Sequence, residues 1–194
     1  MGDHELFCTA GPRPRNAEAT RSAILDAARE RFARESYDDV GLRDIAGHVG
    51  VDAALVSRYF GSKEELFETV IDSCGKGGEL MSGDRATFGQ RVARDVIFEP
   101  KSETKLMGLM IMLRSISSTK AMEVVQRNAN TRFHGPFADW VGGPEGAVRA
   151  RLAAGFIMGM AISRDITGGY SLTPEQCERM TARMATILQD LIDG

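Results

Sequence analysis

The groups best suited to chemistry in this sequence are basic side chains in its first third. Guanidinium and ammonium groups bind phosphate oxygens and base edges when they share one face of a protein. Six residues are candidates for such a patch: Arg13, Arg15, Arg21, Arg43, Arg58 and Lys63. The formal net charge of the chain is −3, and residues 13–63 hold nine Lys or Arg against eight Asp or Glu. Attraction to a polyanion must therefore come from local geometry, with Asp38, Asp39 and Asp44 pointing elsewhere.

The sequence contains none of the short motifs that mark common enzyme sites. A phosphate-binding glycine loop after a strand, an HExxH pair, a CxxC pair and a nucleophile elbow are all absent from it. Its three cysteines, Cys8, Cys74 and Cys177, are scattered without metal-ligand spacing and suit a reducing cytoplasm. We therefore expect no enzymatic activity, no cofactor and no metal site.

The stretch 41–63 must position several of the basic groups, and it has the pattern of two short helices around a turn. The first, 42–49, repeats apolar residues at helical spacing. Gly50 suits the left-handed conformation that ends such a helix, and Asp52 is a favourable N-cap for a second helix over 53–60. This arrangement is typical of a helix-turn-helix unit, whose second helix enters the DNA major groove.

Two short helices cannot bury enough surface alone, so flanking helices must support them. An apolar stripe predicts a helix over 16–35, before the unit. Ser62 and Glu65 have the spacing of a capping box and predict another helix to about Cys74. Glycines at 75, 77 and 78 should break that helix and separate two domains.

The run LRDIAGHVGV (42–51), followed by LVSRYFGSKEELF (55–67), resembles the DNA-binding signature of TetR-type transcriptional regulators. The preceding ILDAARERFARESYDDV (24–40) matches the first helix and loop of that family. The resemblance covers roughly residues 19–67, and beyond them only the architecture is similar. It implies a three-helix DNA-binding domain with a double-stranded operator as its partner.

The resemblance also implies a role for each residue of the unit. Arg43 would reach a base edge or a phosphate. The residues facing the groove floor would be Ala53, Ala54, Leu55 and Arg58, and those holding phosphates would be Ser57, Tyr59 and Lys63. Three features depart from the family: Gly41 stands where a hydroxyl residue is frequent, Ser57 replaces a common tyrosine, and Ala53 and Ala54 offer methyl contacts but no hydrogen bonds. We therefore expect Arg43 and Arg58 to carry most of the base discrimination.

The remainder of the chain is expected to be all-helical, because no stretch alternates polar and apolar residues. The expected helices are 84–98, a central buried one at 102–118, 120–140 with a bend at Gly135-Pro136, 144–166 with Pro144 at N1, and one to about 192 behind a capping box at Thr173 and Gln176. The longest apolar run, 152–162, is shorter than the roughly 20 residues that span a bilayer, so we expect no membrane partner.

The last two of these helices have the pattern of a dimer interface. Apolar and small residues recur on them at spacings of three and four: Val148, Leu152, Gly155, Gly159 and Ile162, then Met180, Met184, Ile187, Leu188 and Leu191. Small residues let helix axes approach closely, so two such helices from each subunit would form a four-helix bundle. The alternative is that these residues pack only within one chain.

Methionines and aromatic residues of the second domain suggest a ligand pocket. The candidates are Met107, Met110, Arg114, Phe133, His134, Phe137, Trp140 and Met158, with Asn128 as a further polar group. Such a lining would suit a small hydrophobic effector. The alternative is that methionine fills an irregular core and that His134 is an ordinary core or surface histidine.

The sequence thus predicts an all-α protein with a flexible arm (1–15), a helix-turn-helix DNA-binding domain (16–65, with the unit at 41–60) and an effector-binding and dimerisation domain (66–194). Its predicted function is that of a cytoplasmic, ligand-responsive repressor acting as a homodimer on a pseudo-palindromic operator. The helix after Ser62 would connect effector and DNA. Two alternatives stay open: a small-molecule-binding protein with weak DNA binding, and an effector-independent regulator whose pocket is filled.

Overall fold

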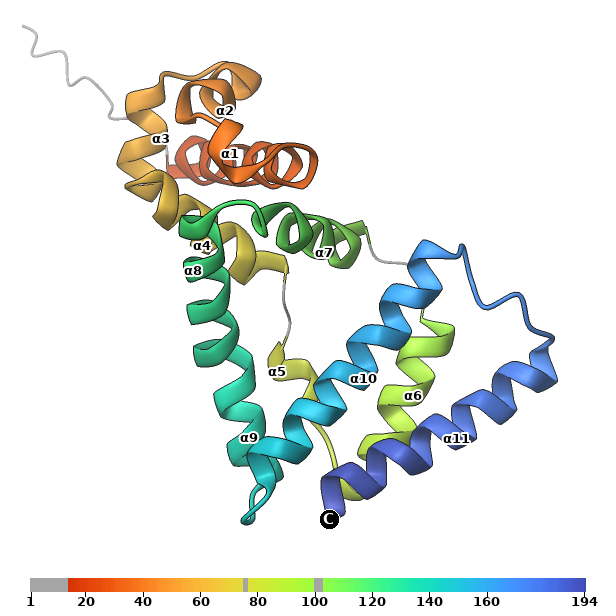
Figure 1. Cartoon of the computed structure of the whole chain (residues 1–194). Coiled ribbons are helices and arrows are strands. Elements are labelled where there is room, and N and C mark those ends of the chain that lie inside the picture. Colours follow the sequence, from red (N-terminus) through yellow and green to blue (C-terminus); the bar gives the residue numbers. More distant parts are fainter. Residues whose placement is uncertain (1–13, 75–76, 100–102) are drawn as a thin grey trace, which may run out of the picture.

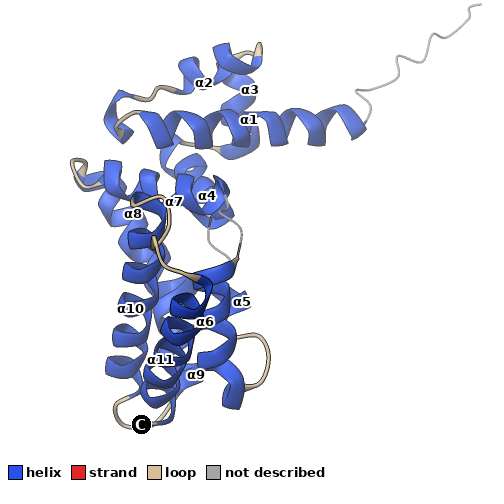
Figure 2. Ribbon diagram, turned by 90° about the vertical axis from the view of Figure 1, so that its right-hand side faces the viewer, coloured by secondary structure: helices blue, strands red, loops and turns tan. Residues whose placement is uncertain are grey.

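The computed structural model describes residues 14–74, 77–99 and 103–194, and this part of the chain is helical without any strand (Figures 1 and 2). The α-helices are α1 (Pro14–Arg34), α2 (Leu42–Val49), α3 (Ala53–Phe60), α4 (Lys63–Cys74), α5 (Gly77–Leu80), α6 (Phe88–Phe98), α7 (Glu103–Ser115), α8 (Thr119–Ala129), α9 (Gly135–Val141), α10 (Gly146–Ile166) and α11 (Pro174–Asp193). The short 3₁₀ turns η1 (Tyr37–Asp39) and η2 (Arg85–Thr87) and the π-helix η3 (Asn130–His134) complete it. Most of the expected arm lies outside the described residues, and α1 already begins at Pro14.

The first hydrophobic core lies among α1 to α4 and is completed by α7 and α8. At its centre, the ring of Phe67 meets the rings of Phe32 and Tyr37, each at a centroid distance of 4.9 Å. Ile111 of α7 and Val124 of α8 are buried in the same core. The four N-terminal helices therefore do not close their core alone, since two helices from later in the chain cover it.

The second core is built by α6, α9, α10 and α11. Helix α6 lies directly on α11, and Gly89 marks their closest approach: a Cβ added there would be 2.2 Å from the Ala185 carbonyl oxygen. The rings of Phe88, Phe137 and Trp140 fill the end of this core. Figure 1 shows this group at the opposite end of the molecule from α1 to α3, with α4, α7 and α8 between them.

Three local features differ from the sequence-based prediction. The helix expected at 102–118 was predicted to be buried all round, yet Leu113 of α7 is 49% exposed. Helix α7 packs against α1 and α4 with one of its sides, and Leu113 lies outside that contact. The break in the long helix is a π-helix, which ends one residue before Gly135. Helix α10 begins at Gly146 and not at Pro144, because the left-handed Gly142 and Gly143 extend the preceding turn.

Candidate functional site

The turn between α2 and α3 has the geometry that its sequence predicts. Gly50 closes α2 in the left-handed region, at φ 77° and ψ 33°. The Val51 amide donates to the Ala46 carbonyl at 3.0 Å, which fixes the chain direction after the turn. The Asp52 carboxylate then accepts the Ala54 amide at 2.7 Å and caps α3. Each of these contacts is local in sequence.

Burial decides which face of α3 is available to a ligand. Val56 is fully buried and Phe60 is 7% exposed, so these two residues fix the helix to the core. The opposite face presents the exposed Ala54, Ser57 and Arg58, flanked by the half-buried Ala53, Leu55 and Tyr59. The residues expected to face DNA thus lie on the outer side of α3 or at its edges.

The arginines of the unit project from this surface. Arg43 on α2 and Arg58 on α3 are exposed and make no hydrogen bond or ion pair with any described residue. The guanidinium of Arg21, from α1, lies 4.7 Å above the Phe60 ring and so places a third cation at the end of α3. Arg58 thus projects from the outer face of α3, Arg43 projects from α2, and Arg21 lies beside Phe60 at the end of α3.

Two of the three acids near the unit accept hydrogen bonds from their own chain. Asp44 accepts the Gly41 amide at 2.9 Å, which caps α2 without any contribution from a residue-41 side chain. Asp38 accepts the Ser118 hydroxyl at 3.1 Å, in the direction of α8. Both carboxylates are therefore engaged within the chain, and the expectation that they point away from DNA stays a prediction.

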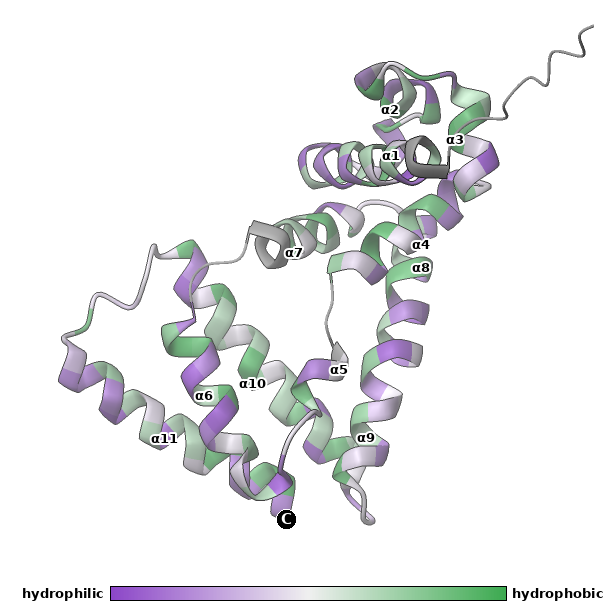
Figure 3. Cartoon of the chain, turned by 180° about the vertical axis from the view of Figure 1, so that it is seen from behind, coloured by the Kyte–Doolittle hydropathy of each residue, from purple (hydrophilic) through white to green (hydrophobic). Residues whose placement is uncertain are grey.

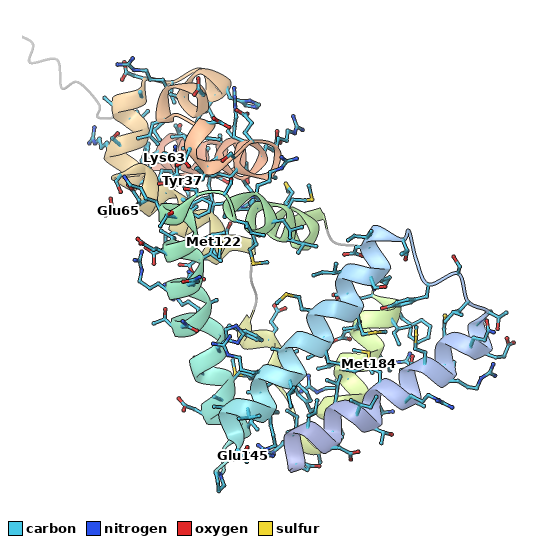
Figure 4. All side chains as sticks on the ribbon, in the orientation of Figure 1. Tyr37, Lys63, Glu65, Met122, Glu145 and Met184 are labelled. Atoms are coloured by element: carbon cyan, nitrogen blue, oxygen red, sulfur yellow. The ribbon has the colours of Figure 1, made fainter. Side chains whose placement is uncertain are left out.

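The start of α4 holds Lys63 in a defined place (Figure 4). Ser62 and Glu65 form the expected capping box, with the Ser62 amide donating to Glu65 at 2.7 Å. The Lys63 ammonium lies 4.3 Å from the centre of the Tyr37 ring. Burial lowers the pKa of Lys63, against the opposing charges of Asp38 and Glu64. Lys63 is thus held by a ring of its own chain beside the surface where it was expected to meet phosphate.

A cavity of about 380 Å³ lies among α5, α6, α7 and α10. Its apolar wall includes Val96, Leu109, Met112 and Ile157, and Phe133 of η3 closes it. Its charged residues are Glu79, Arg91, Asp95, Glu99, Arg164 and Asp165. The volume is within the range of about 300–1,000 Å³ that is usual for small-molecule sites.

Only two of the expected pocket residues, Phe133 and Met158, line this cavity. The other six point elsewhere. Met107 and Met110 pack against the first core, and Arg114 donates to the Ala33 carbonyl at 2.9 Å. Phe137 is fully buried in the second core, Trp140 packs against it, and the ring of His134 lies tilted against that of Phe133.

Helix geometry explains why the expected residues are not gathered around this cavity. Residues near a bend in the sequence point to different sides of successive helical turns, so closeness along the chain does not bring them into one pocket. The charged lining of α6, including Arg91, had no distinguishing signal, because its spacing is that of any solvated helix face.

The expected dimer residues fall into two groups. On α10, Val148 and Leu152 are 54% and 56% exposed, and Gly155 and Gly159 are exposed with no atom within 4 Å of an added Cβ. The half-buried Ile162 continues this stripe. On α11, Ile187 is 45% exposed, and Met180 and Leu191 are half-buried. Met184 and Leu188, by contrast, are 2% and 0% exposed in the chain's own core, so they support α11 from behind and offer no surface to a second copy.

Helix α10 is also long and apolar enough to cross a membrane by length and composition, with 22% of its most apolar window buried. Charged residues limit that interpretation. Arg149 and Arg151 lie near one end and Arg164 and Asp165 near the other. The uncharged run between them is shorter than the roughly 20 residues that a bilayer requires.

Comparison with protein families matches both halves of the chain. Residues 24–70 match the model for bacterial regulatory proteins of the tetR family. Residues 86–192, more than half of the chain, match the model of a tetracyclin repressor-like C-terminal domain. The chain belongs to the TetR family. It is therefore a DNA-binding transcriptional regulator, as the helix-turn-helix geometry indicates.

Curated relatives of this TetR-family chain are named as regulators and not as enzymes. The transcriptional regulatory protein RaaS of Mycobacterium tuberculosis is 39% identical over 93 residues, covering 44% of this chain and 43% of that protein. The regulator BetI of Agrobacterium fabrum is 42% identical over 53 residues, covering 27% and 26%. The chain thus matches less than half the length of these relatives.

Solved TetR-type structures resemble the chain over nearly its whole length. A TetR-family regulator from Streptomyces coelicolor aligns with a TM-score of 0.56 at 26% identity, covering 95% of this chain and 100% of that one. NalD of Pseudomonas aeruginosa, a repressor of a multidrug efflux pump, aligns with a TM-score of 0.66 at 22% identity, covering 87% and 95%. The latter likeness concerns the fold alone.

Proposed function

We propose that this regulator is a ligand-responsive repressor that binds a pseudo-palindromic operator as a homodimer, in the cytoplasm. The observation that carries the proposal is the position of the cavity. Leu109 and Met112, which line it, belong to α7, and the same helix buries Ile111 in the DNA-binding core. A ligand in the cavity therefore touches a helix on which the DNA-binding domain rests.

The route from cavity to DNA runs through α7 before it reaches α4. No lining residue of the cavity belongs to α4, the helix first expected to transmit the signal. Gly108 of α7 lies against Cys74 at the end of α4, where an added Cβ would be 2.8 Å from the cysteine Cβ. A shift of α7 by a few tenths of an ångström is therefore passed to α4, and from there to Lys63 and the recognition helix.

The exposed stripe of α10 supports the homodimer. Val148, Leu152 and Ile166 are all more than half exposed, and between them Gly155 and Gly159 leave room for a second helix. Spacings of three and four residues suit helix packing at a shallow crossing angle. A two-fold dimer presents two recognition helices to successive major grooves about 34 Å apart, which predicts operator half-sites with dyad symmetry.

The experiment that tests the DNA part is selection of bound sequences from a random pool, followed by binding measurements on the selected operator. Arg43→Ala and Arg58→Ala should each weaken operator binding by about 1–3 kcal/mol and relax base preference. Arg34→Ala, which removes an exposed arginine at the far end of α1, is the matched control. Unchanged affinity and base preference in both variants would show that these arginines do not read the operator.

An open cavity counts against the effector-independent regulator, because the residues around it leave about 380 Å³ unfilled. The other alternative, a small-molecule-binding protein with weak DNA binding, is tested by the salt dependence of operator affinity. Several phosphate contacts predict a steep loss of affinity with rising salt, with a slope of about −0.9 per phosphate neutralised. A shallow slope would favour a small-molecule-binding protein over a repressor.

A further inference from the structure

The charged groups around the cavity differ in whether the chain already satisfies them. Arg164 and Asp165 form an ion pair at 3.4 Å. Arg164 also donates to the carbonyls of Val96 and Glu99, so it caps the end of α6. This arginine is therefore occupied by its own chain, and its acidic neighbour is neutralised by it.

The remaining acids do not create a binding site for a cation. Glu79 and Glu99 have interactions within the chain. Asp95 is exposed to water at the edge of the cavity, where a carboxylate is well solvated. Water and the chain thus already stabilise these negative charges, and a cationic ligand would gain little from them.

Arg91 of α6 is different. Its Nε and one of its terminal nitrogens, Nη2, are buried and have no hydrogen-bond partner. These two N–H groups form one edge of the planar guanidinium, the edge that binds both oxygens of a carboxylate in parallel. Because a guanidinium stays protonated in proteins, its buried donors are unsatisfied until an acceptor arrives.

This edge is covered by the turn before α6 and has almost no surface open to water. Gly83 lies beside it, and a Cβ added to that glycine would be 3.1 Å from the Arg91 Cζ and 3.2 Å from its Nε. Gly83 thus covers this edge in the present conformation, so the guanidinium of Arg91, which lines the cavity, must turn toward it for an acceptor to reach both donors.

We propose that the cavity binds an amphipathic anion, whose carboxylate or similar planar oxoanion pairs with Arg91. This inference rests on the proposed function, since the anion would be the effector. The apolar body of the ligand lies between α7 and α10, against Leu109, Met112 and Ile157. Binding repairs two unsatisfied donors and fills apolar space in one step, so charge and hydrophobic area act together.

The test compares three probes that share one apolar tail and differ in the head group: decanoate, decanol and decyltrimethylammonium. Binding to the full chain is measured by titration calorimetry. We expect decanoate to bind at least tenfold more tightly than either other probe. Equal affinity for decanoate and decanol would overturn the role of Arg91, and tighter binding of the ammonium would reverse the assigned ligand charge.

Variants separate the head-group contact from the cavity itself. Arg91→Met keeps the apolar stem and should reduce decanoate affinity tenfold or more while leaving decanol binding within about twofold. Arg91→Lys keeps the charge but loses the two-donor edge, so it should recover only part of the preference. Arg94→Met is the matched control: Arg94 is an exposed arginine of the same helix, set over Phe98 and not among the residues that line the cavity.

A further variant separates two claims: that the cavity is the effector site, and that its ligand is an anion. Ala161→Trp places an indole in the cavity and should abolish binding of all three probes, while circular dichroism confirms the helical fold. If all three probes bind Ala161→Trp as well as the parent chain, the cavity is not the ligand site, and the proposed function loses its effector site. If Ala161→Trp blocks binding but Arg91→Met does not lower decanoate affinity, the cavity stands and the anion assignment fails.

Discussion

Tyr37 is a residue whose burial has a measurable consequence for stability. Tyr37 is 4% exposed, and its buried hydroxyl makes no hydrogen bond of good geometry, although the Glu64 carboxylate lies near enough to act on it. Burial, with the charges of Glu64 and Asp38, raises the pKa of Tyr37 from 10.0 to about 12. Between these two pH values the unfolded chain releases the phenolic proton while the folded chain keeps it, so stability falls as pH rises.

Tyr37→Phe should remove this alkaline loss. At neutral pH the variant should be as stable as the parent or more stable by up to about 1 kcal/mol, because it deletes an unsatisfied buried group and keeps the ring beneath Lys63. Urea denaturation at pH 7 and pH 11 measures both effects, and the difference between the two proteins cancels the other titrating groups. An equal alkaline loss in both proteins would show that Tyr37 ionises normally in the fold.

Residue by residue, the sequence predicted what short-range contacts determine. The left-handed Gly50, the Asp52 cap and both capping boxes follow from neighbours within a few positions, and the structure shows each of them. Arg91 was not predictable in this way. Its meaning depends on α7, α10 and the turn at Gly83, which approach it only in the folded chain.

At the scale of the elements, the crossing of α6 and α11 depends on a missing side chain. The Gly89 amide donates to the Gln189 side chain at 3.0 Å, and an added Cβ would be 2.2 Å from the Ala185 carbonyl oxygen. We expect Gly89→Ala to destabilise the chain by about 3 kcal/mol, because backbone must move to admit the methyl group.

The matched control for Gly89→Ala is Gly47→Ala. Gly47 also lies inside a helix, but nothing is within 4 Å of its added Cβ. That variant should gain up to about 1 kcal/mol from helix propensity. Urea denaturation compares the two. Similar effects of both substitutions would show that the α6–α11 contact is looser than described.

Helices α4 and α8 are joined by a row of polar contacts at one-turn intervals. Glu64 and Glu68 meet Lys120 and Arg127, each pair at 3.7 Å, on the exposed edge of the helices. Asp72 likewise pairs with an arginine, Arg132, at 3.1 Å, and it also accepts the side-chain amide of Asn128, a residue that is only 8% exposed, at 2.6 Å. Removing this acceptor leaves a buried donor without a partner.

Asp72→Ala should therefore cost about 1–3 kcal/mol, and Glu68→Ala less than about 1 kcal/mol. Most of the first loss should persist in high salt, since it comes from the desolvated hydrogen bond to Asn128, whereas the part from the exposed Arg132 pair and the loss in Glu68→Ala should vanish. Denaturation at low and high salt distinguishes them. Equal losses would mean that Asn128 finds another acceptor.

Element boundaries show where sequence patterns reach their limit. The sequence pattern predicted every helix of eleven or more residues after residue 80, and the structure contains each of them: α6, α7, α8, α10 and α11. The π-helix at 130–134 and the late start of α10 were not, because both depend on how α9 packs and how the glycine turn closes. Burial all round α7 was also wrong, since the helices packed against α7 leave Leu113 exposed.

At the scale of the whole molecule, the exposed α10 stripe should decide the oligomeric state. Leu152 is 56% exposed within the chain, so Leu152→Asp should leave its own fold intact. In a dimer the same substitution would bury two charges, which is strongly unfavourable. We expect Leu152→Asp to sediment as a monomer and to lose most operator affinity. Ile116→Asp, 66% exposed on the turn after α7, is the control that should remain dimeric.

The final prediction concerns the coupling of cavity and operator. Gly108→Ala brings a methyl group to 2.8 Å from the Cys74 Cβ, so α7 and α4 must move apart although neither DNA nor ligand is touched. If this contact transmits the signal, the variant should change operator affinity severalfold and reduce the factor by which decanoate changes it. Linkage requires that operator DNA alter decanoate affinity by that same factor, in the variant as in the parent.

Fluorescence anisotropy with labelled operator measures the operator affinity and the factor by which decanoate changes it. Gly78→Ala is the control, because nothing lies within 4 Å of its added Cβ. Gly108 and Gly78 are both helical glycines, so a propensity effect alone would appear in each variant. Coupling that is unchanged in Gly108→Ala would show that the signal bypasses the α7–α4 contact. The remaining route from the cavity would then be through α10 and the dimer interface, and Leu152→Asp would be expected to abolish the response.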